Sequence, residues 1–215
     1  MHRTMREFAF DGQTALQAVI SQSEYGSLEQ AVASLSIFSN PETVIQVRAK
    51  NLFSVIRAKA QQKKGEHAGA AGDRVMLDDN LSPIMAFTWA NDIARGRDLQ
   101  YNHIVSMSDD VSLYTNLANI VALPAFLSKP TDTHKTIKSI LFHRSLELYG
   151  NVLLGQSPSR PVCYDSLKWS DPLPAVRDVE SVVRKHMATK PKNRTVISAR
   201  NIGWLFSNYQ PDSSV

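Results

Sequence analysis

The chain of 215 residues is long enough for one ordinary domain or two small ones, and it can bury a substantial core. Hydrophobic residues make up 43% and charged residues 20% of it, which indicates a globular protein and excludes a disordered one. No apolar run has the length of a membrane span, and the N-terminus lacks a signal peptide's apolar stretch. The single cysteine, Cys163, excludes an internal disulfide and a cysteine-based zinc site. We therefore expect a cytoplasmic protein without a membrane partner.

The first third of the sequence predicts helices. One opens at Asp11, and Gly26 stops it. Ser27 and Gln30 have the spacing of a capping box, in which the serine oxygen and the glutamine amide satisfy free backbone donors. This spacing predicts a second helix that ends near Asn40.

A third helix is predicted from residue 41 to about residue 64. Asn40 caps it, and Pro41 holds its first position. Its apolar face consists of Ile45, Leu52 and Ile56. Basic residues recur every seven positions and so share one side, namely Lys50, Arg57 and Lys64. This pattern favours contact with nucleic acid or an acidic partner, or simply a solvated face.

The middle of the chain changes character. Residues 65–73 are small and lack apolar anchors, which predicts a flexible linker or loop. Ser82 and Pro83 then cap a helix that ends at Gly96. Two short strands are predicted at 101–105 and 119–123, followed by a helix that Asp132 or Thr133 caps and Gly150 ends.

The last section begins with a proline-rich connection and continues with a helix at about 175–187. A basic turn at 190–194 follows, and residues 197–206 return to the core. The fold class is therefore predominantly α (α+β): a helical N-terminal part, a small ββα-like central element and a helical, basic C-terminal part. The predicted segments are 1–64 (helical, basic), 65–73 (linker or loop), 74–150 (central) and 151–215 (basic).

One stretch, 101–135, has the residues of a hydrolytic site. A phosphodiester can be cut with one histidine that takes a proton from water and one divalent metal that neutralises the leaving oxygen. Three pieces of the stretch fit such a site: Asn102-His103-Ile104-Val105, Asn119-Ile-Val-Ala-Leu-Pro124 and Ser128-Lys129. On these residues the chain resembles the HNH (His-Me finger) endonucleases, over about 35 of its 215 residues.

The resemblance implies residue roles. His103 would be the general base, Asn119 (or, with closer spacing, Asn116) would brace the loop, and a divalent ion such as Mg²⁺ would be bound. The metal ligands would be Asn102, Ser128 and His134. The chain departs from the family at two of them, because Asn102 replaces an Asp or His and Ser128 replaces an Asn or His. These departures are also compatible with a scaffold that has lost cleavage and kept a nucleic-acid groove.

The net charge of +4 is concentrated in two clusters that flank a more neutral middle. The basic residues expected to contact nucleic acid are Arg48, Lys50, Arg57, Lys64, Lys185, Lys190, Lys192 and Arg194.

Three hypotheses follow. The first is a DNA- or RNA-cutting, metal-dependent nuclease of the phage, plasmid or defence type. The second is a non-catalytic nucleic-acid-binding subunit of a larger nucleoprotein complex, such as an antiviral defence effector or a nucleocapsid. The third is a helical protein–protein adaptor.

Overall fold

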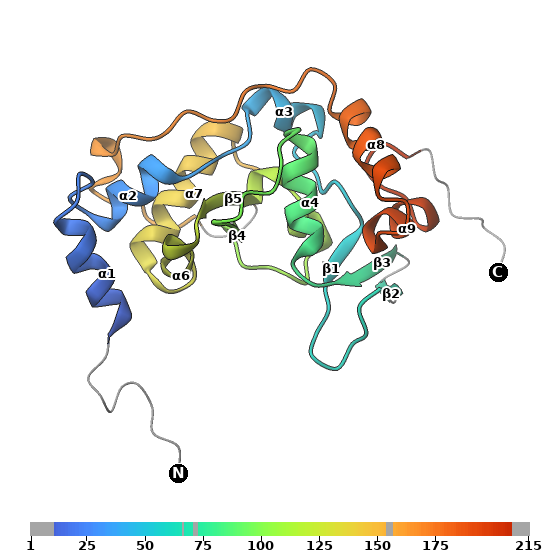
Figure 1. Cartoon of the computed structure of the whole chain (residues 1–215), viewed down its shortest axis with the longest axis horizontal. Helices are drawn as coiled ribbons and strands as arrows, with labels where there is room; N and C mark the ends of the chain where they lie inside the picture. The colour runs from blue at the N-terminus through green and yellow to red at the C-terminus, as the bar shows by residue number, and fades with distance from the viewer. Residues whose placement is uncertain (1–10, 66, 71–72, 154–156, 208–215) are drawn as a thin grey trace, which may run out of the picture.

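A computed structural model describes residues 11–65, 67–70, 73–153 and 157–207. The chain is 47% helix and 12% strand, which confirms the mostly helical α+β class (Figure 1). The α-helices are α1 (Gly12–Ser21), α2 (Leu28–Leu35), α3 (Pro41–Gln46), α4 (Leu81–Ala90), α5 (Val111–Tyr114), α6 (Ala125–Thr133), α7 (Lys135–Tyr149), α8 (Val179–Thr189) and α9 (Arg194–Asn201). The strands are β1 (Val55–Arg57), β2 (His67–Ala70), β3 (Asp73–Asp78), β4 (Leu99–His103) and β5 (Ile120–Pro124).

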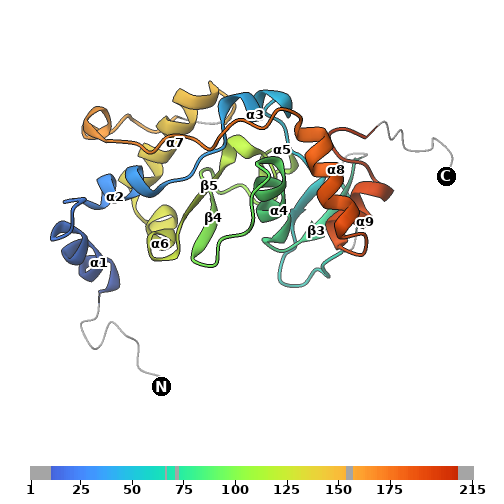
Figure 2. The ribbon, with the colours of Figure 1, turned by 45° about the horizontal axis from the view of Figure 1, so that its top comes forward.

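The strands form two small sheets. In the first, β3 lies between β1, which is parallel to it, and β2, which is antiparallel. In the second, β4 and β5 pair antiparallel, with Leu99 opposite Pro124 and His103 opposite Ile120. The three-stranded sheet lies near α8 and α9, and the β4–β5 pair lies near α6 (Figures 1 and 2).

The central element has the predicted strand–strand–helix order. Helix α6 begins directly after β5 and packs on both strands. The loop between the strands holds α5 and a 3₁₀ turn, Leu117–Asn119. The strands begin and end within two residues of the predicted limits. Helix α6 itself was not predicted, because the predicted helix begins at Asp132 or Thr133 and corresponds to α7.

Two large apolar clusters hold the fold together, with a small third one around Phe87. The larger joins Val44, Met76 and Val183, so the segments 1–64, 74–150 and 151–215 share one core. The other lies among α2, β5, α6 and α7, where Leu123 and Ile140 are buried. Among the described residues, no helix combines the length and the hydropathy that crossing a membrane requires.

Three predicted N-caps are present. The side chain of Asp11 accepts a hydrogen bond from the Gln13 N–H. The Ser27 Oγ accepts one from the Gln30 N–H at 3.1 Å, and the Asn40 Oδ1 accepts one from the Glu42 N–H. The second half of the capping box is not formed. Instead, the Gln30 amide donates to the Lys168 carbonyl and accepts from the Lys168 N–H, and so holds the segment between α7 and α8.

The predicted helix from residue 41 to about 64 is wrong beyond Gln46. Arg48 and Ala49 have φ of +53° and +49°, so the backbone turns out of the helix there. The chain then bonds to distant partners: the Leu52 N–H donates to the Thr115 carbonyl, and β1 pairs with β3. These bonds and the burial of Leu52 outweigh the weak helical pattern. The stripe of Lys50, Arg57 and Lys64 on one helix face therefore does not exist.

The predicted linker at 65–73 is also corrected, because residues 67–70 form β2 on the edge of the first sheet. Gly65 turns the chain with φ +86° and donates its N–H to the Leu77 carbonyl at 2.6 Å. Residues 66, 71 and 72 lie outside the described part. Small residues are compatible with an edge strand because pairing needs only their backbone.

Several helix limits differ from the prediction. Helix α4 ends at Ala90 rather than Gly96, and Ser82 lies inside it, where the Asp78 carboxylate accepts its N–H at 3.0 Å. His134, and neither Asp132 nor Thr133, caps α7, because its Nδ1 accepts the Ile137 N–H. Helix α8 starts later than residue 175 because the Asp178 side chain caps it there.

Candidate functional site

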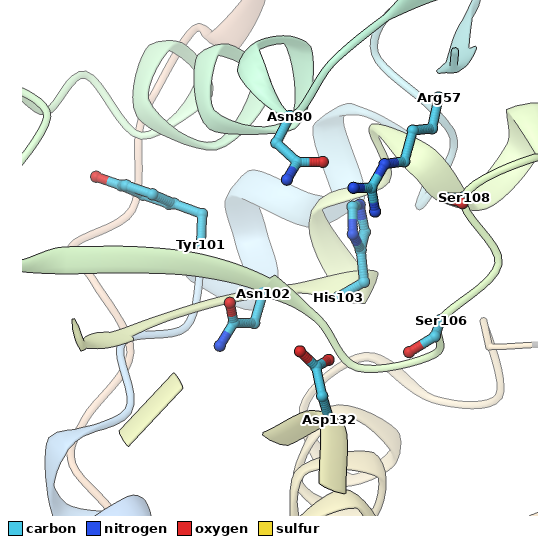
Figure 3. A pocket seen from close by; sticks show the side chains of 8 residues that line it. All are labelled: Arg57, Asn80, Tyr101, Asn102, His103, Ser106, Ser108 and Asp132. Carbon is cyan, nitrogen blue, oxygen red and sulfur yellow. The ribbon is translucent and has the colours of Figure 1, made fainter. Parts of the chain in front are cut away.

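A polar pocket of about 340 Å³ opens where β4 ends, between the start of α4 and helix α6 (Figure 3). Strand β1 and the loop after β4 complete its walls. It is lined by Arg57, Asn80, Tyr101, Asn102, His103, Ser106, Ser108 and Asp132. We call it the His103 pocket. Two predicted site residues, Asn102 and His103, are thus brought together with a predicted nucleic-acid contact, Arg57.

His103 is half-buried, and its ring is fixed from one side. Its Nε2 lies 2.9 Å from the Tyr114 carbonyl oxygen, and its ring stacks on the Tyr114 ring at 5.2 Å between centroids. Burial lowers the pKa of His103, an effect that the bond to Tyr114 opposes and the nearby charge of Arg57 strengthens. Burial thus favours the neutral form of the imidazole. Since a carbonyl only accepts, Nε2 carries the proton and Nδ1 is left as a base.

Asn119 is fully buried at the end of the loop between β4 and β5. Its Oδ1 accepts from the Val105 N–H at 2.8 Å, and its Nδ2 donates to the carbonyls of Val105 and Leu113, both at 3.1 Å. Asn119 thus lies where a loop brace is needed. Asn116, the other candidate, instead donates to the Ala49 carbonyl at 2.7 Å.

The predicted metal ligands do not come together as a set. The Asn102 amide and the Ser128 hydroxyl bond each other, with Nδ2 to Oγ at 3.0 Å and Oγ to Oδ1 at 3.1 Å. The Asn102 Nδ2 also donates to the Thr131 hydroxyl at 2.9 Å. His134 does not line the pocket: its Nδ1 caps α7, and its Nε2 lies 3.5 Å from the Gln17 amide nitrogen.

A divalent ion therefore does not fit the set Asn102, Ser128 and His134, because its polar atoms are already engaged with one another or with backbone. Within residues 11–65, 67–70, 73–153 and 157–207, no three His, Cys, Asp or Glu side chains are grouped so that they could hold a metal. Among the residues that the structure describes, Asp132 is the one carboxylate that lines the His103 pocket.

The residues of the predicted basic surface lie in separate parts of the structure. Lys64 and Arg194 are neutralised by a pair of acids: Lys64 contacts Asp79 at 3.0 Å, and Arg194 contacts Asp78 at 3.0 Å and Asp79 at 3.5 Å. These ion pairs hold α9 to the end of β3. Lys64 and Arg194 are therefore part of the fold, rather than free to bind a polyanion.

The other basic residues lie apart from these. Arg48 lines a different hollow, beside Tyr149, and Lys50 is exposed just after it. Lys190 lies over the Trp89 ring at 5.8 Å, while Lys185 and Lys192 are exposed on and after α8. Of the predicted set, only Arg57 lines the His103 pocket.

The sequence did not identify five of the pocket residues, namely Asn80, Tyr101, Ser106, Ser108 and Asp132. Asp132 follows Ser128 by one helical turn on α6, so its position on the same face could have been inferred. Asn80 holds the N-cap position of α4, but its side chain makes no capping bond and points into the pocket (Figure 3). The sequence does not indicate that the Asn80 side chain is left without a capping bond.

No protein-family model, curated protein or solved structure matches this chain. The HNH resemblance is thus neither supported nor contradicted by a relative, and the function has to be inferred from the pocket itself.

Proposed function

We propose that the protein binds the sugar–phosphate backbone of a nucleic acid in the His103 pocket. One observation carries the proposal: the exposed Arg57 side chain lies beside the His103 ring and, among the described residues, has no ion-pair partner (Figure 3). A guanidinium without a carboxylate presents a fork of N–H donors that matches a phosphate. The pocket adds neutral polar groups on Asn80, Ser106 and Ser108.

The acid in the pocket limits where a phosphate can lie. Asp132 projects from α6 and is well separated in Figure 3 from Arg57, which projects from β1. Because like charges repel, a bound phosphate is held on the Arg57 side of His103. This position is next to the imidazole, whose favoured neutral form does not itself attract the anion.

Hydrolysis is a second candidate function, and the bond from His103 Nε2 to Tyr114 favours it. Nδ1 could take a proton from water as the water oxygen bonds to phosphorus and the ester P–O bond breaks. The imidazolium would then return the proton to the leaving oxygen, and Arg57 would stabilise the negative charge that develops on the phosphate.

The non-catalytic alternative has support of its own. The reciprocal bonds between Asn102 and Ser128 satisfy both groups without any ligand. A protein that only binds nucleic acid, as a subunit of a defence or nucleocapsid-like complex, needs no metal at that place. We also propose a cytoplasmic location, which the lone cysteine suggests.

The test compares Arg57→Gln and His103→Gln with the wild type on labelled single-stranded DNA and RNA, with and without Mg²⁺ or Mn²⁺. Arg57→Gln should weaken binding about tenfold and reduce the salt slope by about one phosphate contact. His103→Gln should keep binding, because glutamine can still donate to the Tyr114 carbonyl, and should abolish any cleavage. Lys63→Gln, an exposed change outside the pocket, is the matched control.

Equal affinities of wild type and Arg57→Gln would refute phosphate binding at this pocket. Absence of any binding at low salt would favour the protein–protein adaptor. Cleavage that persists in His103→Gln would leave binding intact as a proposal and refute the role of His103 as a base.

A further inference from the structure

We propose that the site takes two neighbouring phosphates of one single strand, the first at Arg57 and the second at Lys59. This inference rests on the proposed function and specifies its substrate class. Lys59 was not among the residues expected to contact nucleic acid. Its position follows from the shape of the surface next to the His103 pocket.

A second hollow, of about 500 Å³, adjoins the first. It is lined by Arg57, Ala58, Lys59, Ala60, Ser106, Ser108 and Asp109. Arg57, Ser106 and Ser108 line both hollows, so the two meet at these residues. We call the combined feature the His103–Lys59 groove. Its two cationic side chains, Arg57 and Lys59, lie two residues apart on one segment.

The backbone of that segment is fixed at each residue. The Arg57 N–H donates to the Ser108 carbonyl at 2.8 Å, and the Ala58 N–H donates to the Asp78 carbonyl at 2.7 Å. The Lys59 N–H donates to the Gln62 Oε1 at 2.9 Å. Because the backbone is already ordered, a ligand has only the two side chains to immobilise, which lowers the entropic cost of binding.

The spacing of the two cations fits adjacent phosphates. Two residues of chain span at most about 7 Å between their Cα atoms. Neighbouring phosphates along a stretched strand are separated by a similar distance, so Arg57 and Lys59 can each hold one. Among the described residues, Lys59, like Arg57, has no acidic partner that would compete with a phosphate.

The acids in the groove limit the number of phosphates. Asp132 lines the first hollow and Asp109 lines the second. The groove thus holds as many carboxylates as cations, so it offers no positive charge for a third phosphate. The charge pattern therefore favours two phosphates over contact with a long polyanion.

The recessed position of His103 favours a single strand. Its ring lies between the start of α4, which carries Asn80, and α6, which carries Asp132 (Figure 3). The phosphates of a duplex lie on the outside of a wide, stiff cylinder, which follows a recessed ring less readily than a flexible strand does. A single strand is narrow and flexible enough to place a phosphate beside the imidazole.

Oligothymidylates and oligouridylates that carry one, two or three phosphates test the inference by calorimetry at low salt. For the wild type, the affinity should rise about fivefold or more from one phosphate to two and change little from two to three. Lys59→Gln should remove the gain between one and two phosphates and leave the affinity for the one-phosphate probe unchanged. Lys63→Gln is the control, because Lys63 is exposed nearby in the chain and lines neither hollow.

Three results would each overturn the inference and leave the proposed function intact. The first is that Lys59→Gln binds the two-phosphate probe like the wild type, and the second is that Lys63→Gln loses as much affinity as Lys59→Gln. The third is that a duplex of the same sequence competes as well as the single strand. If instead no probe binds to the wild type, the proposed function itself fails. Lys59 and Lys63 are both exposed, so neither change should affect folding.

Discussion

Replacing Asn119 with alanine should destabilise the protein by about 2–4 kcal/mol. The change removes one acceptor and two donor bonds from the loop between β4 and β5. The carbonyls of Leu113 and Val105 keep bonds from the backbone N–H groups of Thr115 and Met107, so neither is left unpaired, and each lost bond costs about 0.5–1.5 kcal/mol. The Val105 N–H loses its partner but is half-buried, so water compensates it in part, and the three losses together give about 2–4 kcal/mol.

The assay is urea unfolding followed by circular dichroism, together with hydrogen exchange of the loop amides between Val105 and Asn116. Asn40→Ala is the matched control: it removes an N-cap and a bond to Leu173, at a cost of about 1 kcal/mol, and leaves the loop untouched. Only Asn119→Ala should speed exchange in the loop. A loss below about 1 kcal/mol with unchanged exchange would show that Asn119 does not brace the loop.

Two further changes probe the site and the fold. Burial keeps the folded pKa of His103 below that of the unfolded chain, near 6.5, so protons bind the unfolded state more readily as the pH falls through that value. The free energy of unfolding of the wild type should therefore decrease more between about pH 6.5 and 5 than that of His103→Gln, and parallel pH profiles from urea titrations would contradict this. Gly150 ends α7 with φ +73° and ψ −168°, a region that a side chain strongly disfavours, and no atom lies within 4 Å of an added Cβ. Gly150→Ala should consequently cost about 1–3 kcal/mol from backbone strain alone, measured by thermal unfolding, and a change below about 0.5 kcal/mol would show that the strain is relieved by local movement.

The features that the sequence predicted are those decided over a few residues. A cap such as Ser27 needs only the N–H three positions later, and Gly150 ends a helix through its own backbone freedom. The two strands β4 and β5 were predictable for the same reason, whereas helix α6 was not predicted. Each element has its own local pattern, and the antiparallel pairing needs no distant partner beyond the connecting loop.

The segment after Gln46 shows where local reasoning ends. Ile45 and Leu52 have helical spacing, yet Ile45 is 71% exposed and Leu52 is fully buried. What decides the structure there is the pairing of β1 with β3 and the bonds to Thr115, none of which leaves a periodic signal. Arg57 consequently lines a pocket instead of continuing a helical stripe, which only the tertiary structure could reveal.

The contacts of the site residues separate stability from function. His103, Asn119, Asn102 and Ser128 are all engaged by hydrogen bonds to the protein itself, so their positions are explained by folding alone. The Arg57 side chain is different, because it is exposed in a polar pocket and contributes no ion pair among the described residues. Its charge even opposes protonation of the neighbouring imidazole. Since folding does not require the Arg57 guanidinium, loss of binding in Arg57→Gln with an unchanged free energy of unfolding would assign that charge to the ligand.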